Sequence, residues 1–239
     1  MMVWGVIFPP TFGAHSPEGN FDAFDTQLHK NFDALPEKRR ELYVFPGEPR
    51  VLSPPAYVLD VYGKLTQGPS ASWHGHTMSR PIEENEWPSE YALEKPRENL
   101  TAIIKVGFNI LLVAEALKNI MERVDSGIHQ FRPITITMPR GAVYPVQYYT
   151  MIIGQWLDSF VPEMSDPECY TFKMNSYYVK EHRKHEMAGL AFSSSRIGKS
   201  HLWKEMRLER PPLCISDKLY VEIITAGLRL PKHFQMKEV

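Results

Sequence analysis

The distribution of proline is the feature that most constrains the fold of this chain. Twelve of the 20 prolines fall within the first 100 of 239 residues. Each proline fixes φ and removes a backbone donor, so we expect residues 1–100 to be rich in loops and to contain no long helix. Within this part, residues 41–45 and 56–62 alternate apolar with β-branched or aromatic side chains. This alternation predicts two short strands there.

The second half of the sequence has a different pattern, which includes helical spacing. Leu112, Leu117, Ile120 and Val124 recur at intervals that place them on one face of an amphipathic helix, which we expect to end near Gly127. A hairpin is predicted from 131–138 and 144–153, and further strands at 170–175 and 189–193. Residues 201–208 fit either a strand or a helical turn. A short C-terminal helix is predicted, with Ser216 as its N-cap and Gly227 at its end.

Strand segments interleaved with at least two helices predict an α+β fold. We expect one mixed domain over residues 1–239, with a mainly antiparallel sheet, a central amphipathic helix and a short C-terminal helix. Residues 1–100 would form a loop-rich N-terminal part with short strands, and residues 101–239 the α+β core. The hydrophobic content of 43% is sufficient for a continuous core in a chain of this length.

The charge balance argues against two classes of partner. Lys plus Arg total 27 and Asp plus Glu total 28, so the chain has no broad cationic field for nucleic acid or for an anionic membrane surface. Only Cys169 and Cys214 are present, which excludes a disulfide framework. The N-terminus has no basic leader, and the longest apolar stretch, 103–116, is too short to cross a bilayer. We therefore expect a cytoplasmic protein.

Two groups of histidines could carry chemistry. His182, His185 and Glu186 could meet on one helical face and bind a metal, although their order differs from the known helical zinc motifs. The alternative is a solvated charged segment. His74 and His76 could pair as ligands or as acid and base, but no third partner is visible, so surface histidines in a loop are the favoured interpretation.

Residues 196–200 (RIGKS) are similar to the end of a phosphate-binding loop. The first glycine of that motif is absent and no long helix is predicted after Ser200, so we expect no nucleotide site. Neither cysteine has a neighbouring His or Asn, and no nucleophile elbow occurs. The sequence therefore contains no recognisable catalytic motif.

An acidic run interleaved with aromatic residues is the candidate for partner binding. It consists of Glu83, Glu84, Glu86, Trp87, Glu90 and Tyr91. Aromatic side chains are enriched in the centres of interfaces, and the negative charge would steer the segment towards a basic partner. A solvated loop is the alternative, because single exposed aromatics are ordinary.

Three segments between Ile110 and the C-terminus resemble a bacterial family, immunity protein eleven, whose members occur beside toxins of polymorphic and contact-dependent secretion systems. Residues 111–136 look like the family's helix, turn and "Q-F-x-P" strand. Residues 148–165 are similar to its "YY…LDS…S" segment. Residues 198–230 resemble its closing "HLW…SD-L…AGL" unit, so the matches keep their order over about 130 residues.

The resemblance implies an antidote that occludes or distorts a cognate toxin, with no enzymatic step and no cofactor. The matching residues are mostly apolar or turn residues, so the resemblance does not indicate an interface. Two alternatives stay open. One is an enzyme, either a metal-dependent hydrolase that uses His182 and His185 or an antidote that removes a toxin-made modification. The other is a homo-oligomer such as a homodimer, held by apolar patches.

Overall fold

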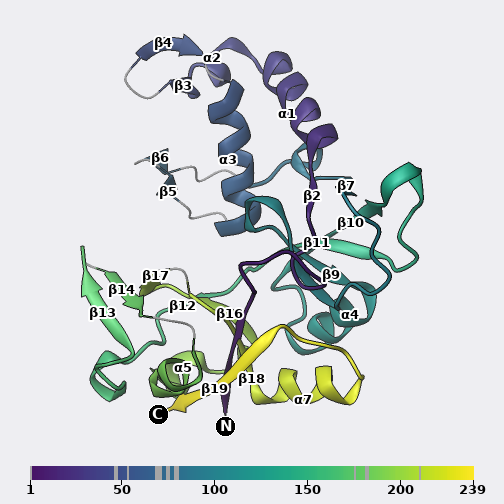
Figure 1. Cartoon of the computed structure of the whole chain (residues 1–239). Coiled ribbons are helices and arrows are strands. Elements are labelled where there is room, and N and C mark those ends of the chain that lie inside the picture. The colour runs from purple at the N-terminus through teal and green to yellow at the C-terminus, as the bar shows by residue number, and fades with distance from the viewer. Residues whose placement is uncertain are drawn as a thin grey trace.

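Helices and strands are mixed along the whole chain, which confirms the α+β class (Figure 1). The computed structural model describes residues 2–45, 48–52, 54–67, 72–73, 76–77, 81–174, 176–180, 183–209 and 211–239. The α-helices in this part are α1 (Asp22–Ala34), α2 (Glu37–Arg40), α3 (Pro54–Gln67), α4 (Glu115–Val124), α5 (Lys184–Gly189), α6 (Ser194–Ile197) and α7 (Asp217–Thr225). Four short 3-10 helices accompany them, η1 (Glu84–Glu86), η2 (Gly107–Asn109), η3 (Pro139–Gly141) and η4 (Pro162–Met164).

Two six-stranded sheets form the body of the molecule. The first has the order β12 (Trp156–Leu157), β16 (Leu202–Glu205), β18 (Leu213–Ser216), β1 (Val3–Ile7), β19 (Lys232–Glu238) and β15 (Ala191–Phe192). The second has the order β2 (Gly19–Asn20), β7 (Glu90–Leu93), β10 (Gln130–Thr137), β11 (Tyr148–Ile152), β9 (Leu111–Ala114) and β8 (Ile103–Lys105).

Three smaller sheets complete the strands of the described residues. A three-stranded sheet has the order β13 (Tyr170–Lys173), β14 (Ser176–Val179) and β17 (Leu208–Glu209). Two isolated pairs are β3 (Val44–Phe45) with β4 (Glu48–Leu52), and β5 (Ser72–Trp73) with β6 (His76–Thr77). Parallel pairs join β12 to β16, β15 to β19, β7 to β10 and β14 to β17. The expectation of a mainly antiparallel sheet is therefore wrong, because each larger sheet is mixed.

The N-terminal part differs most from the prediction, since it contains two long helices. α1 has 13 residues and lies in the proline-free interval between Pro17 and Pro36. α3 has 14 residues and begins with Pro54 and Pro55, in the first turn, where the missing N–H has no intrahelical acceptor. Residues 56–62, predicted as a strand, are therefore helical, and of 41–45 only Val44–Phe45 is a strand.

The predictions for the second half are largely confirmed. α4 is amphipathic and Gly127 adopts a positive φ of 71° after it, although the helix begins at Glu115 and Leu111–Ala114 form β9. β10 and β11 pair as the predicted hairpin. Residues 202–205 are a strand, β16. In α7, the hydroxyl of Ser216 accepts from the amide of Leu219 at 3.2 Å, as expected for an N-cap.

The first sheet separates two apolar clusters. Side chains of β16 and β18 alternate, so that Leu202 and Ile215 join the larger cluster while Trp203 and Cys214 join the smaller one. The larger cluster also takes in apolar side chains of α1, α3 and the second sheet. Residues from both the 1–100 and the 101–239 parts thus pack together, and the single-domain arrangement remains a prediction.

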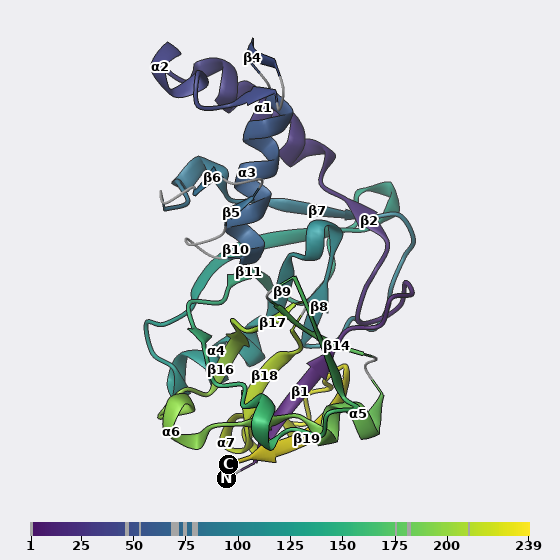
Figure 2. The same ribbon diagram turned by 90° about the vertical axis from the view of Figure 1, so that its left-hand side faces the viewer.

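The views in Figures 1 and 2 place the helices around the sheets. α1, α3 and the β3–β4 pair lie at one end of the molecule, whereas both termini meet at the opposite end. α7 packs against β1, β18 and α4, and α5 packs against β19. Among the described residues, no helix combines the length and apolarity that a membrane crossing requires.

Candidate partner-binding surface

The predicted acidic segment lies on η1 and β7, and ion pairs cover much of its charge. Glu84 has a side chain that is 81% exposed, and the Arg132 guanidinium donates to it at 2.8 Å. Arg132 also lies over the ring of half-buried Trp87, 5.6 Å from its centroid. Glu83 forms an ion pair with Arg39 at 2.6 Å. The net negative potential that could steer a basic partner is therefore smaller than the sequence suggests.

Two residues of the segment, Glu86 and Tyr91, are buried, so the surface position expected for them is not what the structure shows. The alternation of β7 turns Tyr91 into the core, where its hydroxyl donates to the Pro17 carbonyl at 3.0 Å. Glu86 has no exposed surface and accepts from the Tyr57 hydroxyl at 3.0 Å. Glu90 is half-buried and accepts from the Thr137 hydroxyl at 2.7 Å. Of the six residues, Glu84 is exposed, and Glu83, Trp87 and Glu90 are partly exposed.

Glu86 belongs to a buried ionic network beneath the acidic segment. Lys64 of α3 lies 2.9 Å from Asp60 and 3.5 Å from Glu86, and each of the three side chains is at most 5% exposed. The Tyr43 hydroxyl donates to Asp60 at 3.1 Å. The side chain of Glu86 also accepts from the backbone amide of Glu83 at 2.9 Å, which fixes η1. This network holds the acidic segment against α3.

The described part of the chain offers no metal centre. It contains no group of three or more His, Cys, Asp or Glu side chains that could hold an ion. His182 lies outside the described residues. His185 is 75% exposed and its Nε2 lies 3.0 Å from the carboxylate of Glu186, which caps α5 by accepting from the Arg183 amide. The metal alternative is therefore left without a described third ligand.

Within the described residues, the other candidate motifs do not form an arrangement that could carry out catalysis or bind a ligand. His74 lies outside them, and only the backbone of His76, on β6, is described. Residues 196–200 span the end of the four-residue α6 and the turn before strand β16, so no long helix follows Ser200. Burial raises the pKa of both Cys169 and Cys214, which keeps these thiols protonated.

The β13–β14 hairpin projects from the molecule and exposes aromatic and apolar side chains, whereas the aromatic residues of the acidic segment are buried or half-buried. Residues 170–180 contain four aromatics, Tyr170, Phe172, Tyr177 and Tyr178, and two lysines, with no acidic residue. Phe172 is 57% exposed and Met174 is 94% exposed, the largest value among the exposed large apolar side chains of the described residues. The strand 170–175 was predicted, although Asn175 lies outside the described residues. The exposure of its apolar side chains is not predicted from the sequence, although the density of aromatics is a signal for it.

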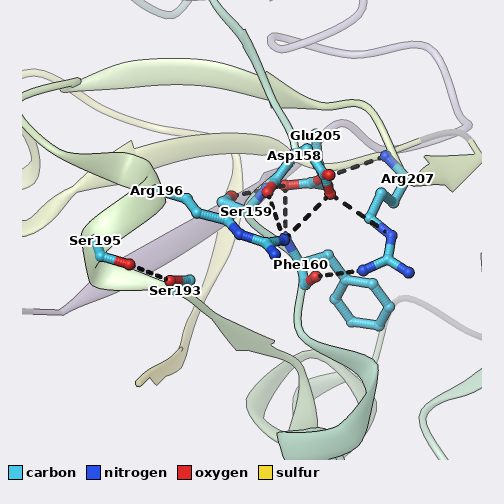
Figure 3. A network of polar contacts seen from close by, with 8 residues as sticks. All are labelled: Asp158, Ser159, Phe160, Ser193, Ser195, Arg196, Glu205 and Arg207. Atoms are coloured by element: carbon cyan, nitrogen blue, oxygen red, sulfur yellow. Dashed lines mark hydrogen bonds and ion pairs between the residues drawn. The ribbon is translucent and has the colours of Figure 1, made fainter.

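Arg207 attaches this hairpin to the body of the molecule. The backbone amide of Tyr177 donates to the Arg207 carbonyl at 3.3 Å, and the Arg207 guanidinium lies 5.1 Å from the centroid of the Tyr177 ring. The same guanidinium donates to the Phe160 carbonyl at 3.2 Å and lies 3.6 Å from Asp158 (Figure 3). The inner strand of the hairpin is thus tied to residues 158–160.

Next to Arg207 lies Glu205, a carboxylate with no exposed surface (Figure 3). Its Oε2 accepts from the Ser159 amide at 2.9 Å, the Ser159 hydroxyl at 2.6 Å and the Phe160 amide at 3.1 Å. Its Oε1 accepts from the Arg207 amide at 3.1 Å. Burial raises the pKa of Glu205, and the hydrogen bonds from the Ser159 hydroxyl and from the amides of Arg207 and Ser159 counteract part of that shift. Glu205 thereby fixes the backbone on both sides of the hairpin's attachment.

Comparison with models of protein families gives a match. The model of a family described as Immunity protein family (Imm11) matches residues 19–235, which is most of the chain. The match includes the acidic segment, the hairpin and the Glu205 network. No curated protein matches the sequence.

Proposed function

Because the chain belongs to the Imm11 immunity protein family, we propose that it binds a cognate toxin protein and blocks it without a catalytic step. The family match carries this proposal, since the family is one of toxin immunity. The exposed aromatic and apolar side chains of the hairpin support binding, because such side chains are enriched in interface centres. The buried thiols and the lack of a metal-holding cluster in the described residues are compatible with it.

Co-expression tests the proposal directly. The product of the neighbouring gene is expressed with and without the chain, growth is measured, and any complex is isolated. We expect rescue together with a complex of fixed stoichiometry. Protection in vitro should require at least one chain for each toxin molecule. Rescue without association, or protection at a small fraction of the toxin concentration, would contradict the proposal and favour an enzymatic antidote.

The enzymatic alternative has its own variant. Replacing His182 and His185 together with alanine removes the residues on which a metal-dependent activity would depend. If binding is the mechanism, this double variant should protect cells as well as the wild type does. Loss of protection with the complex intact would indicate chemistry at these histidines.

The accessible part of the acidic segment remains a predicted contact with the toxin. Glu84 and Trp87 belong to it, and replacing both with alanine should lower the affinity by more than about 2 kcal/mol if they are hot spots. Arg132 must be kept, because it contacts both side chains. Unchanged affinity would assign the toxin contact to another surface.

A further inference from the structure

We propose that the β13–β14 hairpin is the principal contact with the toxin, and that it docks on an acidic surface that also offers an apolar recess. This inference rests on the proposed function and adds to it the side of the molecule and the chemistry of the partner. It follows from three observations on the described residues: the exposure of the hairpin's apolar side chains, its local charge, and the way the body of the molecule holds it.

The apolar side chains of the hairpin become more exposed towards its tip. Tyr170 lies near the base, 5.5 Å from the Phe160 ring of the smaller core cluster. Phe172, further out, has the Tyr177 ring as its aromatic neighbour, at 4.8 Å, and is more than half exposed. Met174 is almost fully exposed and has a positive φ of 49°, a conformation that is uncommon for a residue with a side chain. An apolar side chain displayed in this way is unfavourable in water and suits a partner's recess.

The charge of the hairpin indicates the sign of the charge on the partner's surface. Lys173 and Lys180 are exposed, and residues 170–180 contain no Asp or Glu, so the two hairpin strands carry two positive charges in a chain whose net charge is −1. Exposed Glu209 of β17, opposite Tyr178, is an acidic neighbour on the inner side of the sheet. The pairs of the hairpin place Lys173 opposite Ser176, and place Thr171 opposite Tyr178. The acidic segment, in contrast, already has its exposed carboxylates paired with Arg39 and Arg132. Charge complementarity therefore favours an acidic toxin surface for the hairpin.

The hairpin is also held in place before any partner binds. Its inner strand, β14, pairs with β17 and is bound to Arg207, whose neighbour Glu205 is hydrogen-bonded to residues 159 and 160. The outer strand, β13, is an edge strand of its sheet and lies at the periphery of the molecule in Figure 1. A rigid attachment lowers the entropy cost of binding, so the side chains of β13 are presented at little further cost.

Two sets of variants test the hairpin, with the product of the neighbouring gene as the probe. The apolar set is Phe172→Ala with Met174→Ser, and its control is Phe12→Ala, which removes a 67% exposed side chain from the N-terminal part. The charge set is Lys173→Glu with Lys180→Glu, and its control is the same change at exposed Lys38 and Lys218. All four proteins should fold, because the substituted side chains are exposed, and thermal unfolding verifies this.

We expect the apolar pair to weaken toxin binding by at least thirtyfold and the control by less than threefold. Charge reversal in the hairpin should lower the association rate constant at least tenfold at low salt, with the difference shrinking as salt is added. Reversal at Lys38 and Lys218 should leave it within threefold. Unchanged affinity of the hairpin variants, or faster association after charge reversal, would overturn the inference while leaving toxin binding itself intact.

Two further outcomes also overturn it. If the wild-type chain fails to bind the toxin at all, the proposed function fails and the inference with it. If native mass shows that the isolated wild-type chain is a dimer and that the apolar pair makes it monomeric, the hairpin contacts a second copy of this chain and not the toxin.

Discussion

The acidic segment and the hairpin each rest on a carboxylate that is closed off from solvent, and different groups stabilise the two carboxylates. Glu86, beneath the acidic segment, accepts from the Tyr57 hydroxyl and has the ammonium group of Lys64 3.5 Å away. Asp60 shares the same Lys64 at 2.9 Å. The charge of Glu86 is thus offset by a buried cation that itself serves two carboxylates.

Glu205, beside the base of the hairpin, has no such cation. Within the part of the chain that the structure describes, no Lys or Arg side chain lies within ion-pair distance of it. Three backbone amides and the Ser159 hydroxyl donate to its oxygens in place of a cation. Since these donors belong to the backbone around residues 159, 160 and 207, the carboxylate holds two chain segments together directly.

Because different groups stabilise the two carboxylates, the stability of the two networks should depend on different kinds of side chain. The N-terminal network includes a cation shared by two carboxylates, because Lys64 lies between Asp60 and Glu86, and removing it would take a buried positive charge away from both. The Glu205 network depends on the acceptor, because removing it would leave buried amides without one. The first network should respond to the loss of a charge, and the second to the loss of a hydrogen-bond acceptor.

Lys64→Met should have the largest effect on stability. It removes the cation between Asp60 and Glu86 while keeping a similar volume, and we expect the free energy of unfolding to fall by about 4 kcal/mol. Denaturation in urea measures it. The control is Lys38→Met, since Lys38 is exposed on α2, and it should change the free energy by less than about 0.5 kcal/mol. Equal effects of the two substitutions would show that the buried cation is dispensable.

Glu205→Ala should have the second largest effect, with a fall of about 3 kcal/mol, because the amides of Ser159, Phe160 and Arg207 lose their acceptor in a buried site. Amide hydrogen exchange should also quicken at Tyr177, whose amide donates to the Arg207 carbonyl. Glu209→Ala, at an exposed position of β17, is the matched control. Unaltered exchange at Tyr177 would mean that Glu205 does not position the hairpin.

Patterns within short stretches of the sequence correctly predict those elements whose stability depends on residues close together in the sequence. The face of α4, the Ser216 cap of α7 and the β10–β11 hairpin all depend on residues close in sequence, and each was confirmed. The sequence of α3 predicts a strand at 56–62 only if its prolines exclude a helix at every position. Pro54 and Pro55 stand in the first turn, where proline is compatible with a helix, and Tyr57, Val61 and Leu65 then follow at helical spacing.

The candidate surface was only partly predictable, because burial is decided by residues distant in the sequence. The acidic segment shows its charge in the sequence, but Glu86 is buried by Tyr57 and Lys64 of α3, more than twenty residues earlier. The aromatic density of the hairpin is visible in the sequence as well. Its attachment to Arg207 is not, because the parallel pairing of β14 with β17 joins segments about thirty residues apart.

A third substitution tests Lys204, the side chain that links the first sheet to α3. Lys204 of β16 donates to the carbonyl of Thr66 in the last turn of α3, and lies 5.0 Å from the Trp156 ring centroid. Burial lowers the pKa of Lys204 to about 8. The unfolded chain, with its ordinary pKa near 10.5, binds more protons than the folded one between these values, so the wild type should gain stability as the pH rises through this window.

Lys204→Met should abolish that gain. The stability of the wild type relative to the variant should increase by about 2 kcal/mol between about pH 8 and pH 10, measured by urea denaturation at each pH. Lys218→Met, at an exposed position of α7, should retain the pH dependence of the wild type. A constant difference between wild type and Lys204→Met over this range would show that Lys204 is solvated and does not link α3 to the first sheet.

Glu205→Gln should have the smallest effect on the free energy of unfolding. The pH dependence of that effect tests the network of amides around Glu205. Burial raises the pKa of Glu205, so the folded state holds this proton more tightly than the unfolded chain does. The wild type should therefore be most stable relative to the glutamine variant below about pH 4.5, and lose that advantage as the pH rises through the raised pKa. The hydrogen bonds from Ser159 and Arg207 oppose the effect of desolvation on the pKa, which keeps the change small. Glu209→Gln, on the exposed end of β17, should show no such trend. A wild-type advantage that grows towards neutral pH would mean that the four donors outweigh burial, and that Glu205, like Glu86 beside Lys64, is stabilised in its charged form.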